Sequence, residues 1–127
     1  MSNGLALEVQ FLASLLADHR SDKASLDRAS LLAASLQDSR IPQFKDTMGW
    51  VYYRRGDFRT AVTLLEPAAA NLPGLALAHY HLGMCYSSLG QFEKAADQFK
   101  AALAADPDTE LEMKIKNGMK TIAARYR

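Results

Sequence analysis

The chain contains two closely similar segments, DTMGWVYYRRGDF at 46–58 and YHLGMCYSSLGQF at 80–92. Matching residues lie 34 positions apart, and the match extends beyond both segments. A repeat of this length indicates a stacked array, because one unit alone cannot bury its apolar face. The repeat therefore constrains the fold more than composition does. The matched pairs are Gly49 with Gly83, Tyr52 with Tyr86, Gly56 with Gly90, Phe58 with Phe92, Ala61 with Ala95, Leu65 with Phe99, Ala68 with Ala102 and Pro73 with Pro107.

Each unit is predicted to form two helices joined by a tight turn. In both halves of the unit, apolar residues recur every three or four positions, which is typical of one helical face. Gly56 and Gly90 are expected to end the first helices in left-handed turns. Gly49 and Gly83 lie within the first helices, where the lack of a side chain lets a neighbouring helix approach closely. We therefore expect Gly83→Leu to overpack the helix pair, at a cost of about 1–3 kcal/mol or more.

With these residues in this order, residues 42–109 resemble the tetratricopeptide repeat. The resemblance implies an all-α fold, a helix-turn-helix solenoid wound as a right-handed superhelix, with a capping helix at its C-terminal end. Lys45 and His79 stand where a large aromatic residue is often found early in the repeat. We expect one domain over residues 1–127, composed of a divergent helix pair at 5–41, repeats at 42–75 and 76–109, and the cap at 110–127.

The two flanks follow the repeat less closely. The N-terminal helices are predicted at about Leu5–Asp18 and Lys23–Gln37, where only Leu31 and Ala34 keep the 34-residue register with the apolar face of the second helix. The tail has a capping-box pattern at Thr109 and Glu112, and then a stripe of apolar residues at helical spacing. One apolar and one polar face is what a terminal cap requires.

Composition and motifs argue against several classes of function. A net charge of +1 gives no global field for nucleic acid or an anionic membrane, and no segment is apolar enough for membrane insertion. His79 and His81 would point about 200° apart on a helix, so they cannot share a metal ion. Cys85 is predicted to be a small core residue. We expect no enzyme activity and no cofactor.

The location in the cell stays open from the sequence alone. A single cysteine fits a reducing compartment, such as the cytoplasm for a complete chain. A periplasmic location fits a fragment of a larger exported protein. The sequence is also similar to the closing repeats of large bacterial tetratricopeptide proteins, some of which accompany exopolysaccharide export and exosortase-type protein sorting.

The first helices of successive units line the concave surface of such an array. Trp50, Tyr53, Tyr80 and Met84 are the informative residues there, since large apolar groups and arginine commonly anchor interfaces. The alternative is that Trp50 and Tyr80 pack on one another and on the flanking repeat. The full predicted surface comprises Gln43, Asp46, Thr47, Trp50, Tyr53, Arg54, Leu77, Tyr80, His81, Met84, Ser87 and Ser88, with Leu111 and Lys114 from the tail.

The resemblance implies that this groove binds an extended or helical peptide of a protein partner. The family's clamp for C-terminal carboxylates uses lysine and asparagine, whereas the corresponding positions here hold Asp46, Trp50, Tyr80 and Met84. A free C-terminal carboxylate is therefore not the expected ligand.

A structural role is the second hypothesis. Residues 5–16 are apolar on nearly every side of the predicted helix, and such a helix requires cover on more than one face. Either a preceding repeat or a second copy could supply that cover. The chain would then be a segment of a longer array or a homodimer formed through this helix. The apolar residues of the N-terminal helix are Leu5, Leu7, Val9, Phe11, Leu12, Leu15 and Leu16.

Overall fold

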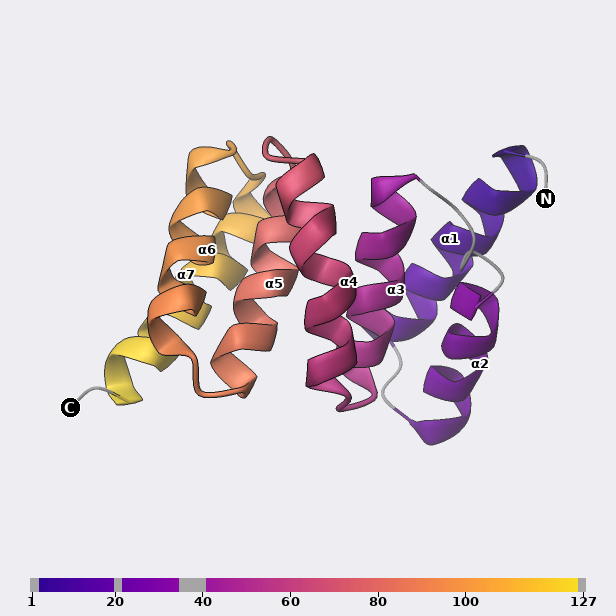
Figure 1. Cartoon of the computed structure of the whole chain (residues 1–127), viewed down its shortest axis with the longest axis horizontal. Helices are drawn as coiled ribbons and strands as arrows, with labels where there is room; N and C mark the ends of the chain where they lie inside the picture. Colours follow the sequence, from indigo (N-terminus) through magenta and orange to yellow (C-terminus); the bar gives the residue numbers. More distant parts are fainter. Residues whose placement is uncertain (1–2, 20–21, 35–40, 126–127) are drawn as a thin grey trace.

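The computed structural model describes residues 3–19, 22–34 and 41–125 (Figure 1). These residues form seven α-helices and no strand, which confirms the all-α solenoid fold class. No helix in these ranges combines the length and the apolar character needed to cross a membrane. The helices are α1 (Asn3–His19), α2 (Lys23–Ala34), α3 (Pro42–Arg54), α4 (Phe58–Asn71), α5 (Ala76–Ser88), α6 (Phe92–Ala104) and α7 (Thr109–Arg125).

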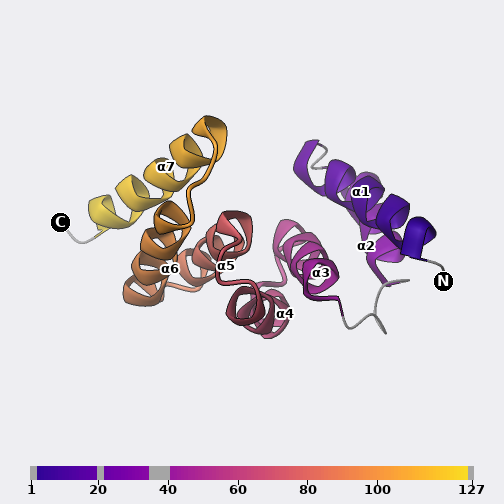
Figure 2. The ribbon, with the colours of Figure 1, turned by 90° about the horizontal axis from the view of Figure 1, so that it is seen from above.

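The helices are arranged as an arc in two layers (Figure 2). The inner layer consists of α1, α3, α5 and α7, each of which packs against the next. The outer helices α2, α4 and α6 each pack against inner helices, but not against one another. The array therefore curves towards its odd-numbered helices, and its concave face lies between α1 and α7.

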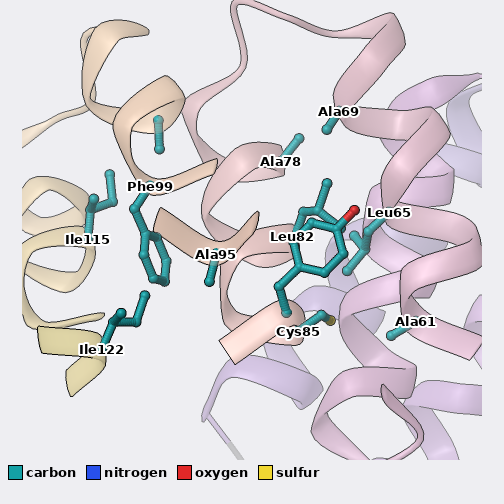
Figure 3. Packing of buried hydrophobic residues seen from close by; sticks show 12 residues of the cluster. Ala61, Leu65, Ala69, Ala78, Leu82, Cys85, Ala95, Phe99, Ile115 and Ile122 are labelled. Atoms are coloured by element: carbon teal, nitrogen blue, oxygen red, sulfur yellow. The ribbon is translucent and has the colours of Figure 1, made fainter. Parts of the chain in front are cut away.

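The glycines of the repeat permit the closest contacts of the core. A Cβ on Gly83 would lie 2.6 Å from Cε1 of Phe99, and one on Gly49 would lie 2.5 Å from Cγ of Leu65. Both distances are too short for carbon atoms, so the predicted close approach is confirmed. Phe99 is fully buried and lies beside Ile115 and Ile122 of the tail helix (Figure 3). The tail helix thus packs on the helices of the second repeat, as predicted.

The turns within the repeats follow the prediction, but the cap of the tail helix does not. Gly56 and Gly90 have φ angles of 86° and 77°, in the left-handed region that favours glycine. The sequence pattern placed the cap of α7 at Thr109. In the structure the Asp108 carboxylate accepts a hydrogen bond from the Leu111 amide at 2.8 Å. The cap therefore lies one residue earlier, since Thr109 already belongs to the helix.

The N-terminal helix pair does not keep the register of the repeats. Leu31 was matched with the core residue Leu65, yet its side chain is 75% exposed, and Ala34 is exposed as well. Leu26 and Ala29 supply the buried face of α2 instead. The prediction for Leu31 is wrong because α1 and α2 lack the glycine and alanine pattern that fixes the packing of the later pairs. Residues 35–37, predicted as helix, lie outside the described residues.

Candidate functional site

The concave face contains a hollow of about 540 Å³. All four inner helices contribute to it, so it is a product of the array rather than of one repeat. The Arg54 side chain lies on its α3 wall, and the Lys114 side chain lies opposite on α7. The lining residues are Asp18 of α1, Trp50 and Arg54 of α3, Leu77, Tyr80 and His81 of α5, and Glu110, Leu111 and Lys114 of α7.

Trp50 forms the floor of this hollow. Only 8% of the residue is exposed, so the prediction that it is an exposed groove residue is wrong. Its ring stacks on His81 at 4.1 Å between centroids and on Tyr53 at 4.5 Å. Its Nε1 donates a hydrogen bond to Asp18 of α1 at 2.5 Å. The alternative prediction, packing on Tyr80 and the flanking helices, is confirmed, because three inner helices converge on this ring.

Asp46 and His81 were also predicted to face the groove, but both are buried, at 4% and 5% exposure. The two side chains lie 2.9 Å apart, Asp46 Oδ1 to His81 Nδ1, across the interface of α3 and α5. Polar groups removed from water need partners, and these two residues satisfy one another. They join the repeats beneath the hollow, where Thr47 is also buried at 5% exposure and accepts a hydrogen bond from Gln10 of α1.

Five of the predicted residues do border the hollow with exposed or half-buried side chains: Arg54, Leu77, Tyr80, Leu111 and Lys114. Gln43 is exposed, but it lies at the contact of α1 with α3, where its carbonyl accepts a hydrogen bond from Gln10. Tyr53 is half-buried between Trp50 and Phe58. Neither of these two residues lines the hollow.

Met84 lines a second, smaller hollow of about 230 Å³ between α5 and α7. Tyr80 and Lys114 border both hollows, so the two are adjacent. Asn117 and Thr121 were missed by the sequence analysis, although they lie three and seven residues after Lys114, on the same face of the tail helix. Asp18 and Glu110 were also missed. The smaller hollow is lined by Tyr80, Met84, Ser87, Lys114, Asn117, Gly118 and Thr121.

The hollow carries charges of both signs. Lys114 pairs with Glu110 along α7 at 3.5 Å, and Asp18 accepts the Trp50 hydrogen bond. Arg54 forms no ion pair with the described residues, and its buried Nε has no hydrogen-bond partner among them. Burial raises the pKa of the Tyr80 hydroxyl, and nearby Tyr53 and Asp18 raise it further. The hollow thus combines apolar side chains with charged ones, and among the charged ones Arg54 has no ion-pair partner within the described residues.

The side chains most often used in catalysis or metal binding either lie away from the hollow or, among the described residues, are not grouped to hold a metal ion. Cys85 is fully buried, as predicted, and burial together with Asp46 raises the pKa of its thiol to about 12. In the described part of the chain, no cluster of three histidine, cysteine, aspartate or glutamate side chains is placed to hold a metal ion. His79 lies near α6, where its ring nitrogens contact Gln98 and the Pro73 carbonyl, each at 2.9 Å.

The family model of the tetratricopeptide repeat matches residues 47–109, the segment in which the 34-residue period is strongest. The chain is a tetratricopeptide repeat protein. Its structure is similar to the NMR structure of the first TPR domain of the human RPAP3 protein, with a TM-score of 0.68 and 18% sequence identity. The match covers 91% of this chain and 92% of that one. No curated protein is detectably similar in sequence.

Tetratricopeptide repeats are non-catalytic scaffolds that mediate contacts between proteins, and their concave surfaces serve as binding faces. At 18% identity, the likeness to the human domain shows the fold alone. The narrower similarity to bacterial export and sorting proteins stays a prediction.

Proposed function

We propose that this tetratricopeptide repeat protein binds a peptide segment of a partner protein in its concave hollow. The observation that carries the proposal is the hollow of about 540 Å³ lined by all four inner helices. Clefts that bury most of a small-molecule ligand typically have a volume of about 300–1,000 Å³. A volume of this size receives several side chains of a peptide that lies along the inner surface.

The chemistry of the hollow suits an anchored peptide. Leu77 of α5 and Leu111 of α7 offer apolar surface, and Tyr80 of α5 offers a half-buried ring. Beneath them the stack of Trp50 on His81 gives a floor that is already packed. A preformed floor reduces the ordering cost of binding, because fewer side chains lose freedom when the ligand arrives.

The same features favour a scaffold over an enzyme. Cys85 is the only cysteine, and a buried thiol whose pKa is raised to about 12 holds little of the reactive thiolate. The histidine at the floor is engaged between Trp50 and Asp46. These residues stabilise the array, and binding is the role that the hollow supports.

A matched pair of substitutions tests this function. Peptides are first selected from a random 12-residue library displayed on phage, and their affinities are measured by fluorescence anisotropy. Leu77→Asn removes an apolar wall of the hollow, whereas Leu31→Asn makes the same change on exposed α2, outside it. We expect Leu77→Asn to weaken binding about five-fold or more, since an apolar contact of this kind contributes about 1 kcal/mol or more. Equal effects of both changes, or a library that yields no binders, would contradict the proposal.

Self-association is a second candidate, favoured by one observation at the other end of the array. Leu12 and Leu15 lie three residues apart on α1, and they are 38% and 39% exposed. Large exposed apolar side chains that occur together mark interfaces more often than those that occur singly. We propose a two-fold contact through this surface, because an isologous dimer is the commonest way to cover such a patch.

A further inference from the structure

Arg54 is the charged side chain of the hollow whose hydrogen-bonding capacity is least used. It lies at the C-terminal end of α3, it is half-buried, and its Nε is buried with no hydrogen-bond partner among the described residues. A guanidinium presents five N–H donors in a rigid fork and accepts nothing. Since Nε itself is shielded, a ligand in the hollow meets the remaining donors of the fork, and hydrogen bonds between a guanidinium and a carboxylate are stronger than those between neutral groups.

The acidic side chains around the hollow leave Arg54 unmatched. Asp18 accepts the hydrogen bond of the Trp50 indole at 2.5 Å. Glu110 lies near Lys114 on the same helix, and its side chain is 82% exposed at the rim. Neither carboxylate lies within ion-pair distance of Arg54, although both line the same hollow. Arg54 is therefore available to pair with a carboxylate that a ligand brings into the hollow.

An apolar recess lies beside this charge. Tyr80 borders both hollows, and Met84, one helical turn further along α5, borders the smaller one. Four residues of an α-helix rise about 6 Å, so the two places are within reach of side chains only a few residues apart in a bound peptide. The recess between α5 and α7, of about 230 Å³, is large enough for one large apolar side chain.

We propose that the groove selects internal peptide segments in which an aspartate or glutamate lies within a few residues of a large apolar residue. The carboxylate pairs with Arg54, and the apolar side chain enters the recess between Met84 and Thr121. This inference rests on the proposed peptide-binding function and names its ligand class. An internal side chain is favoured over a C-terminal carboxylate because the clamp positions of the family hold Asp46, Trp50, Tyr80 and Met84 here, and Asp46 and Trp50 are buried.

The test is a selection from one random peptide phage library on three proteins: the wild type, Arg54→Gln and Arg55→Gln. Arg55 is the matched control, because it neighbours Arg54 but pairs with Asp27 at 3.4 Å and does not line the concave hollow. We expect acidic residues beside leucine, isoleucine, methionine or phenylalanine in peptides from the wild type and from Arg55→Gln. Peptides from Arg54→Gln should keep the apolar residue and lose the acidic one.

A second measurement changes the peptide as well as the protein. In the tightest wild-type peptide, the selected glutamate or aspartate is replaced by glutamine or asparagine, and the C-terminus is made as the free acid and as the amide. We expect the side-chain change to weaken binding to the wild type about ten-fold or more and to leave binding to Arg54→Gln unchanged, the coupling that a double-mutant cycle detects. Amidation should change the affinity less than two-fold.

The outcomes separate this inference from the function on which it rests. If selected peptides lack acidic residues, or if their removal costs the same affinity with and without Arg54, the carboxylate partner is wrong and peptide binding stands. If binding requires the free C-terminal acid, the internal segment is wrong. If the wild type selects no peptide, the inference and the proposed function fail together.

Discussion

The indole of Trp50 lies on the imidazole of His81, with centroids 4.1 Å apart and ring planes inclined by 16°. Each ring is held from a different helix, since Asp18 of α1 accepts from the indole and Asp46 of α3 lies 2.9 Å from the imidazole. The stack therefore joins α1, α3 and α5 at the floor of the concave hollow. Residues that resemble a binding surface in sequence act here as the joint between repeats.

Trp50→Ala should lower the free energy of unfolding by about 3–5 kcal/mol, the range for removing a buried large aromatic side chain. The measurement is urea unfolding followed by circular dichroism, because Trp50 is the only tryptophan and fluorescence would be lost. Trp50→Phe is the matched control. It keeps a ring over His81 and should cost less than the alanine variant. A loss below about 1 kcal/mol for Trp50→Ala would show that the indole is not part of the core.

Gly118→Ala should destabilise the protein, although alanine in a helix interior is normally favoured over glycine by about 1 kcal/mol. The added Cβ would lie 2.7 Å from Cζ of Phe99, a fully buried ring that Gly83 already contacts from α5. Overpacking of this kind costs about 1–3 kcal/mol. Gly74→Ala is the control, since nothing lies within 4 Å of its added Cβ. If Gly118→Ala raises the melting temperature as an ordinary helix substitution would, α7 does not pack on Phe99 as described.

The Cys85 thiol should react slowly with labelling reagents in the folded protein. It should also lower the free energy of unfolding at alkaline pH. Its folded pKa is about 12, against an ordinary value of 9.0, so both states carry the proton below about pH 9. As pH rises towards 12 the unfolded chain loses its proton first, and stability falls by up to about 1.4 kcal/mol per pH unit. Tyr86 contributes in the same direction, because burial raises the pKa of its hydroxyl.

Comparison of the wild type with Cys85→Ala isolates the thiol in urea titrations from pH 8 to 11. The difference in unfolding free energy between the two proteins should be constant up to pH 9 and should shrink above it. Thiol labelling at pH 8 should be slow in buffer and rapid in urea. Fast labelling of the folded protein would contradict the burial of this residue.

Leu12→Glu should weaken any dimer formed through the N-terminal helix pair, because it places a charge on the exposed apolar surface of α1. Sedimentation at high micromolar concentration measures the effect. Met113→Glu is the control, since Met113 is 62% exposed on α7 at the opposite end of the array. A wild type that sediments as a clean monomer would remove the dimer proposal and leave the groove proposal unaffected.

The periodic part of the fold could be predicted from residue types alone. Gly83 and Phe99 specify a close contact between helices because one lacks a side chain and the other fills the space, and the structure has that contact. The 34-residue period then places the same contact at Gly49 and Leu65. The N-terminal pair lacks such residues, and the match of Leu31 with Leu65 was consequently wrong.

The concave face was harder to predict, because the burial of its residues depends on neighbouring helices. Trp50 and Arg54 are one turn apart on the same face of α3, and helical spacing cannot separate them. In the structure Trp50 is covered by α1 and α5, whereas Arg54 remains half-buried on the wall. Asp18 could not be assigned to the hollow, since α1 has no repeat register from which to count.

The most direct test of peptide binding in the hollow is an NMR titration. The ¹⁵N-labelled protein is titrated with the tightest peptide from the phage library, and backbone amide shifts are followed. We expect the largest changes at Leu77, Tyr80, Leu111 and Lys114, around the concave hollow. Changes confined to Leu12, Leu15 and Leu31, or to the outer helices α4 and α6, would contradict binding in the hollow.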